Sequence, residues 1–135
     1  MKDCLFCKIV KGEIPSQKVY EDDQTYAFLD INPVNKGHTL VIPKVHVENI
    51  FDAPSSLMKI LTSTIQKIAI ALGKSADGVN VFMSNKEAAG QEVFHLHYHL
   101  IPRFHDDGIQ IKLPHKSFSD KEMAAIAEGI RKLLA

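Results

Sequence analysis

The sequence predicts an α+β fold: a five-stranded antiparallel sheet with one long helix, a short N-terminal helix and a C-terminal helix. Its 135 residues are a length that typically closes one hydrophobic core, so we expect a single domain over residues 1–135. Apolar residues fall into short strand-like runs joined by tight turns and into longer runs with helical spacing. Strands joined by hairpins and grouped apart from the helices are typical of an antiparallel sheet.

The first three strands are expected in the N-terminal third. Residues 18–21 and 25–29 flank Asp22-Asp23, which predicts a β-hairpin with a tight polar turn. A loop containing Asn, Pro and Gly leads into residues 38–43, whose central Leu-Val-Ile run suits a buried strand.

Two helices are expected in the first half of the chain. Residues 4–11 are apolar on one side and predict one or two helical turns. A longer helix follows, with Asp52 or Ser55 able to cap its start and Gly73 able to supply a left-handed stop. Its apolar stripe recurs at three- and four-residue steps: Leu57, Ile60, Leu61, Ile65, Ile68, Ala69 and Leu72.

The remaining elements are two strands and a final helix. Residues 78–84 and 93–101 predict the strands, with a polar loop over 86–91 between them. The last helix is expected to begin at Ser119, because Glu122 lies three residues on, at the spacing of a capping box. Its expected core face is Met123, Ile126, Ala127, Ile130, Leu133 and Leu134.

Charge and hydropathy exclude several classes of protein. Sixteen Lys and Arg residues balance sixteen Asp and Glu residues, whereas a nucleic-acid binder normally carries a basic excess. No apolar run approaches the ~20 residues that span a bilayer. The segment Met1–Cys4 also lacks the apolar stretch of a secretory signal. We therefore expect a cytoplasmic protein with no nucleic-acid or membrane partner.

The strongest chemical signal is a row of histidines at positions 95, 97 and 99. Chance predicts only roughly 0.02 such runs in a chain of this composition. Alternate residues of a strand share a face, so we expect the three imidazoles to point the same way. A strand with a polar solvent face is the structural alternative. Imidazoles near neutral pH otherwise offer nucleophiles, general acids or metal ligands.

Two other segments could carry chemistry. The loop over residues 85–91 contains amides, a lysine and a glycine, and its backbone N–H groups could surround an anion. Cys4 and Cys7 form a Cys-x-x-Cys pair with no room for a preceding strand, which disfavours a thioredoxin-type site. A metal site, buried apolar cysteines and a redox pair remain open for these two residues.

Residues 95–101 read His-φ-His-φ-His-φ-φ, where φ is apolar, and this run resembles the signature of the histidine triad (HIT) superfamily. The similarity extends over roughly residues 4–104 and is greatest to bacterial members of the nucleoside-phosphoramidase branch. It implies the HIT-like fold and a homodimer. The surrounding segments that share it are 6–9, 13–15, 26–31, 37–44 and 90–91.

The resemblance implies catalytic roles for three histidines. His97 would attack the α-phosphorus of a purine nucleotide, and water would then cleave the nucleotidyl-histidine intermediate to release AMP. His99 would contact the phosphate, and His38 would support the orientation of the nucleophile. Neutral imidazole is a good nucleophile, and a covalent intermediate divides one difficult displacement into two easier steps.

The resemblance also implies binding residues. Asp30 would hold the ribose hydroxyls. The expected base pocket is Phe6, Ile9, Phe28 and Ile31, and the expected phosphate loop is Asn85, Gly90 and Gln91. In members that carry structural zinc, the ligands resemble Cys4, Cys7, His46 and His95, a closed set that leaves no position for water.

One position departs from the pattern of that branch. Glu92 stands where serine usually follows Gly-Gln and helps the leaving group. Paired with Lys86 or with a basic leaving group, its carboxylate would favour amine-linked (phosphoramidate) substrates over phosphate-linked ones.

Three other functions remain as alternatives. The chain could cleave dinucleoside polyphosphates. It could bind a catalytic metal through His95, His97 and His99 together. It could also be a non-catalytic, zinc-stabilised nucleotide-binding module.

Overall fold

A computed structural model describes residues 3–135. Met1 and Lys2, which belong to the expected single domain and to the segment tested for a secretory signal, lie outside the described residues. The α+β prediction and the five antiparallel strands are confirmed. The elements in chain order are α1 (Leu5–Val10), β1 (Lys18–Glu21), β2 (Thr25–Leu29), β3 (Thr39–Pro43), α2 (Ser55–Gly73), β4 (Gly78–Phe82), the 3₁₀ turn η1 (Glu87–Ala89), β5 (Tyr98–Arg103) and α3 (Asp120–Leu134).

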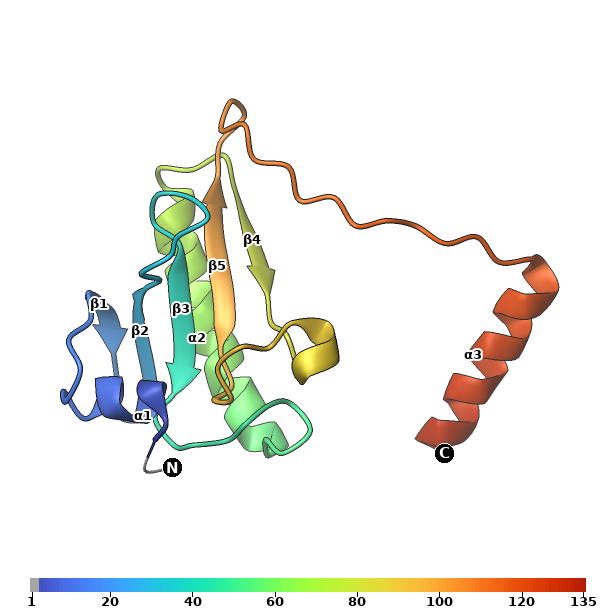
Figure 1. Cartoon of the computed structure of the whole chain (residues 1–135), viewed down its shortest axis with the longest axis horizontal. Coiled ribbons are helices and arrows are strands. Elements are labelled where there is room, and N and C mark those ends of the chain that lie inside the picture. The colour runs from blue at the N-terminus through green and yellow to red at the C-terminus, as the bar shows by residue number, and fades with distance from the viewer. Residues whose placement is uncertain (1–2) are drawn as a thin grey trace.

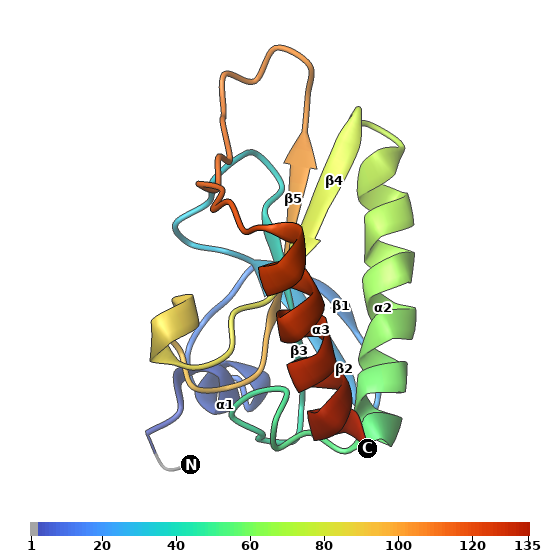
Figure 2. The ribbon, with the colours of Figure 1, turned by 90° about the vertical axis from the view of Figure 1, so that its right-hand side faces the viewer.

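The sheet separates the two helices of the first half of the chain. Its strand order is β1-β2-β3-β5-β4, so β1 and β4 are the edges. The long helix α2 covers one face, and α1 lies against the other (Figures 1 and 2). The loop that carries η1 bulges from the face of the sheet opposite α2 (Figure 2).

Side-chain alternation in β2 and β3 builds a core on each face of the sheet. Ala27 and Val41 pack with the apolar stripe of α2, whereas Phe28 and Leu40 pack with Phe6 of α1. Both strands are therefore buried on both faces, which is why their sequences are almost continuously apolar. Leu40 of β3 is the register partner of His99 in β5. The core cluster that contains Phe6 of α1 therefore lies on the same face of the sheet as His99.

Several element ends differ from the sequence predictions. β3 begins at Thr39 rather than at position 38, and β4 ends at Phe82. Neither Asp52 nor Ser55 caps α2, because Pro54 holds the N-cap position without a side-chain hydrogen bond. Gly73 is the last helical residue and gives no left-handed stop, since the chain continues in right-handed helical geometry at the next residue. The predicted turn at Asp22 is confirmed: its Oδ1 accepts the backbone N–H groups of residues 24 and 25.

The largest correction concerns the strand predicted over residues 93–101. β5 begins only at Tyr98, whose partner in β3 is Val41. Upstream of it, the Leu96 N–H donates to the Val47 carbonyl at 2.8 Å instead of joining the β3 ladder. His95 and His97 therefore both lie outside the regular strand. His95 lies with Cys4, Cys7 and His46 rather than beside His97 and His99, so the prediction that all three histidines share one face is wrong.

Residues 108–135 form a C-terminal arm that leaves the sheet on the side of its β4 edge (Figure 1). An irregular segment carries α3 away from the other elements, and no residue of α3 is buried. The capping box of Ser119 and Glu122 is confirmed. The predicted packing of the apolar face of α3 into the core of this chain is wrong. Within residues 3–135, no helix combines the length and apolar character needed to cross a membrane.

Candidate active site

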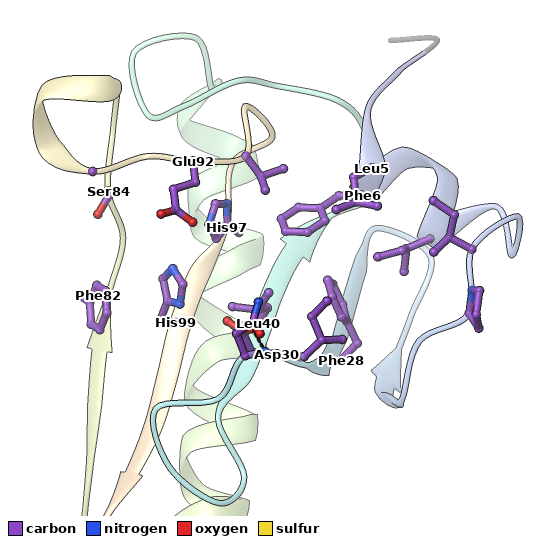
Figure 3. A pocket seen from close by; sticks show the side chains of 17 residues that line it. Leu5, Phe6, Phe28, Asp30, Leu40, Phe82, Ser84, Glu92, His97 and His99 are labelled. Carbon is purple, nitrogen blue, oxygen red and sulfur yellow. Dashed lines mark hydrogen bonds between the residues drawn. The ribbon is translucent and has the colours of Figure 1, made fainter. Parts of the chain in front are cut away.

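A cavity of about 450 Å³ opens between α1, β2 and the segment that leads into β5. One wall is apolar and includes Phe6 and Phe28. His99 and Glu92 lie across the cavity from these rings, and His97 lies between them, beside Phe6 (Figure 3). The lining residues are Leu5, Phe6, Ile9, Ile14, Pro15, Phe28, Asp30, Ile31, Asn32, Leu40, Phe82, Ser84, Gly90, Glu92, Val93, His97 and His99. An apolar wall opposite a few converging polar groups is typical of a small-molecule site.

His97 presents an unprotonated ring nitrogen to this cavity. Its Nδ1 lies 2.7 Å from the His95 carbonyl oxygen, which can only accept, so Nδ1 carries the proton. Nε2 then keeps its lone pair. Burial lowers the pKa of His97, although the bond to the carbonyl opposes that shift. The ring is packed edge-on against Phe6, with 5.1 Å between the ring centroids. His97 is thus a neutral imidazole whose lone pair has a fixed orientation.

His99 has the complementary tautomer. The Val34 N–H donates to His38 Nδ1 at 3.0 Å, so a neutral His38 must carry its proton on Nε2. That Nε2–H donates to His99 Nδ1 at 3.0 Å, which leaves the His99 proton on Nε2. Burial lowers the pKa of His38, and burial with His97 and His38 nearby lowers that of His99 to about 4. His99 therefore offers an N–H donor beside the lone pair of His97.

His38 lies at a different place in this network from the one expected. The expectation was support for His97, but His38 hydrogen-bonds His99, and the His95 carbonyl fixes the His97 ring. His38 also lies 3.6 Å from Asp30 Oδ2. The other oxygen of Asp30 accepts the Asn32 N–H at 2.8 Å, which holds the carboxylate at the rim of the cavity.

The loop before the histidines divides into residues that line the cavity and residues that support it. Gly90 and Glu92 line the cavity, and Gly90 has φ +92°, a left-handed conformation that favours glycine. Asn85 and Gln91 are not among the lining residues. Asn85 accepts the Ile50 N–H, and Gln91 bonds three backbone groups, at residues 48, 86 and 93.

Sequence reasoning missed Phe82 and Ser84 of the cavity wall. Phe82 stacks on His99, with 4.8 Å between ring centroids and 14° between planes. The signal was present: once β4 and β5 pair as an antiparallel ladder, Phe82 lies opposite His99. The expected contact between Glu92 and Lys86 is absent from the described residues, because the Lys86 Nζ lies 4.6 Å from the centre of the Phe51 ring.

His95 belongs to a second cluster, with Cys4, Cys7 and His46. Its Nε2 donates to the Pro43 carbonyl at 2.8 Å, so the Nδ1 lone pair faces the other three residues. His95 Nδ1 lies 3.4 Å from Cys4 Sγ, 3.6 Å from Cys7 Sγ and 3.2 Å from His46 Nδ1. The four ligand atoms all lie within 4.8 Å of one another.

The donor set of this cluster fits zinc. Bonds of about 2.3 Å to sulfur and about 2.0–2.1 Å to nitrogen, in a tetrahedron, separate the ligand atoms by about 3.3–3.8 Å, close to the distances found. The Pro43 carbonyl would orient the His95 ligand, as outer-shell carbonyls commonly do. The cysteines are half-buried among histidines rather than buried in an apolar core. Within residues 3–135, no ligand group joins His95 with His97 and His99, which disfavours a metal shared by all three.

The HIT domain model matches residues 11–106, which include the sheet, α2 and the three histidines. The chain belongs to the HIT domain family. Protein hit of Bacillus subtilis (strain 168) is 44% identical over 139 residues, covering 99% of this chain and 96% of that protein. The adenosine 5'-monophosphoramidase of Schizosaccharomyces pombe is 38% identical over 128 residues, covering 94% and 95%.

Solved structures of HIT-family proteins share the fold. The Streptococcus mutans UA159 protein SMU.412c superposes with a TM-score of 0.94 at 49% identity, covering 100% of this chain and 87% of that one. A HIT-family protein of Bacillus subtilis superposes with a TM-score of 0.90 at 43% identity, covering 98% of each chain. The HIT-like fold predicted from the histidine signature is confirmed.

Proposed function

We propose that this protein cleaves purine nucleotides at the α-phosphate, that His97 is the nucleophile, and that AMP linked to an amine is its preferred substrate. The observation that carries the proposal is the pairing of tautomers, because a lone pair on His97 lies beside an N–H donor on His99. A phosphoryl centre requires both groups: a nucleophile for phosphorus and a donor for its oxygens. The name of the Schizosaccharomyces pombe relative, an adenosine 5'-monophosphoramidase, supports the reaction class.

The cavity accounts for each part of such a substrate. The base would lie between the apolar side chains around Phe6 and Phe28, and Asp30 would accept hydrogen bonds from the ribose hydroxyls. The α-phosphate would then lie at the histidine wall. His97 Nε2 forms a bond to phosphorus as the P–N bond to the amine breaks, and the leaving nitrogen takes a proton from solvent water as it departs. Water then cleaves the phosphorus–His97 bond and AMP departs.

The covalent step is tested by replacing His97. In His97→Ala we expect turnover of an AMP-lysine-type phosphoramidate to fall by at least ~10³-fold, because the nucleophilic route is lost. AMP binding and the melting temperature should change little. His105→Ala is the matched control, since that imidazole is exposed and lies outside the cavity wall. Mass spectrometry of wild type quenched in alkaline denaturant, where a phosphorus–imidazole bond survives, should show an AMP adduct on residue 97. An active His97→Ala protein beside an inactive His99→Ala protein would reverse the assigned roles.

We also propose that Cys4, Cys7, His46 and His95 hold one structural zinc ion. A closed tetrahedral set supplies no open position for substrate, so its contribution is to folding. It would tie α1, which carries Phe6 of the cavity wall, to the segment that carries His97.

Elemental analysis tests the zinc proposal without an activity assay. We expect about one zinc ion per chain and a lower melting temperature in the Cys4→Ser, Cys7→Ser double variant. Zinc-free protein after purification in zinc-containing buffer, with unchanged melting of the double variant, would refute this proposal. That result would leave the assignment of His97 standing.

A further inference from the structure

One carboxylate of the cavity wall has no ion-pair partner in the part of the chain that the structure describes. Glu92 is exposed and lines the cavity, and it takes part in none of the ion pairs of residues 3–135. The side-chain hydrogen bonds that hold this loop come from the adjacent, buried Gln91 instead. The Glu92 carboxylate is therefore available to water and to a bound substrate.

This carboxylate lies close to the proposed nucleophile. Figure 3 shows it beside the His97 ring, on the side of the cavity where Ser84 lies. Burial lowers the pKa of His97, and the Glu92 carboxylate is among the groups that oppose this shift. Such an effect is typical of opposite charges within ~4–6 Å of each other. One water molecule can bridge a space of that size between Glu92 and a phosphorus atom bonded to His97.

The second half of the proposed reaction needs a base at this place. Once AMP is bonded to His97 Nε2, water must attack phosphorus from the side opposite to that bond. That side is the place that the amine has left, so a group that faces the leaving amine also faces the attacking water. The water loses a proton as its oxygen bonds to phosphorus, and a positioned base that accepts this proton accelerates the step.

Glu92 is the one free base among the described residues of the cavity wall. In the adduct both nitrogens of His97 are occupied, Nε2 by phosphorus and Nδ1 by the proton that it donates to a backbone carbonyl. His99 Nδ1 accepts the His38 proton, and its Nε2 carries a proton of its own. Asp30 Oδ1 accepts a backbone N–H, and its Oδ2 lies 3.6 Å from His38 Nε2. The other lining side chains are apolar, amide or hydroxyl groups, which are poor bases.

We infer that Glu92 is a catalytic residue of the second step, the general base that activates water for hydrolysis of the AMP–His97 adduct. The inference rests on the proposed function, because it requires that adduct. The water oxygen bonds to phosphorus as the bond between phosphorus and His97 Nε2 breaks. One proton of the water passes to the Glu92 carboxylate, the other stays on the phosphate of AMP, and His97 regains its lone pair. Because Glu92 is exposed, it then returns its proton to solvent.

The rate of adduct loss tests this role separately from adduct formation. The probe is adenosine 5'-phosphorimidazolide, whose imidazole is a good leaving group. With enzyme in excess over the probe, rapid quenching in alkaline denaturant and mass spectrometry follow the formation and the loss of the adduct in a single turnover. In Glu92→Gln we expect the adduct to form at least as fast as in the wild type and to be lost at least ~10²-fold more slowly, because the amide cannot accept a proton.

Three further variants distinguish a base from a structural residue. Glu87→Gln changes a carboxylate of the same loop outside the cavity wall, and it should lose the adduct at the wild-type rate. Glu92→Asp keeps a carboxylate and should lose the adduct faster than Glu92→Gln. Added formate should accelerate adduct loss in Glu92→Ala, where it can enter the vacated space, and not in the wild type. The melting temperature should be the same in all of these proteins.

Failure of this inference is distinguishable from failure of the proposed function. Adduct loss from Glu92→Gln at the wild-type rate, or equal slowing in Glu87→Gln, would overturn the role of Glu92 and leave His97 as the nucleophile. Absence of the adduct from both the wild type and Glu92→Gln would instead refute the covalent mechanism, and the inference with it.

Discussion

Glu92→Ser removes one carboxylate from the cavity wall and so tests whether its charge influences the choice of leaving group. Two carboxylates, Asp30 and Glu92, line the cavity, and none of its lining residues is lysine or arginine. Lys86, the expected partner of Glu92, lies over the Phe51 ring instead. In the proposed reaction, a leaving group at the histidine wall would therefore meet negative charge that no described basic side chain of the wall neutralises.

The size of the effect follows from Coulomb's law. Two unit charges about 6 Å apart interact by about 3 kcal/mol at an effective dielectric constant of 20, and by about half of that at 40. A polyphosphate leaving group is repelled by this amount, whereas a protonated amine is attracted. We expect Glu92→Ser to raise the ratio of kcat/KM for a dinucleoside polyphosphate to that for an AMP-lysine-type phosphoramidate by ~10-fold or more, since 1.4 kcal/mol is a factor of ten.

The assay compares both substrates in three proteins at one ionic strength. Glu87→Ser is the matched control, because Glu87 is in the same loop, exposed and outside the cavity wall. The change in the ratio should shrink as salt is added, since screening weakens the interaction of partly exposed charges. A ratio that stays constant in Glu92→Ser, or that moves equally in Glu87→Ser, would refute the role of the Glu92 charge.

Three further predictions concern His38, Gly37 and His99. His38→Ala should lower the free energy of unfolding by about 1–3 kcal/mol in urea titrations, because it leaves buried hydrogen-bonding groups unpaired, and it should also lower kcat. Gly37→Ala should lower the free energy of unfolding by about 1–3 kcal/mol, since φ is +89° and the added Cβ would lie 3.1 Å from Pro102 Cγ. The control Gly73→Ala in α2 should not lower it. Equal changes in the two variants would contradict this prediction. Burial lowers the pKa of His99 to about 4, so between about pH 6.5 and 4 the unfolded chain binds more protons than the folded one. The free energy of unfolding should therefore fall as the pH falls through that window, and His99→Gln should reduce the slope. A protein that is more stable at pH 5 than at pH 7 would contradict this prediction.

Local patterns in the sequence predicted most of the fold correctly. The hairpin around Asp22, the apolar stripe of α2 and the capping box of α3 each depend on neighbours within a few residues. Such features persist in whatever tertiary structure the chain adopts, which is why they can be read from sequence. The row of histidines likewise predicted the family correctly. In the structure, His97 and His99 line the same cavity.

Tertiary structure decided which partners each histidine contacts. Alternation of side chains holds only where a segment joins a ladder. Here His95 Nε2 donates to the Pro43 carbonyl and the Leu96 N–H donates to the Val47 carbonyl, and both acceptors are about fifty residues away in the sequence. The same limit applies to Glu92 and to His38, whose actual neighbours come from other parts of the chain.

The sequence by itself therefore determined which elements form and which chemistry is available. Tertiary structure decided which imidazole keeps a lone pair, which one donates, and which one turns toward the cysteines. The sequence shows that α3 is amphipathic, but only the tertiary structure shows that its apolar face does not pack on the other elements of the chain. The physical reason is that amphipathicity shows that a face must be buried, whereas the partner that buries it depends on where the preceding chain directs the helix.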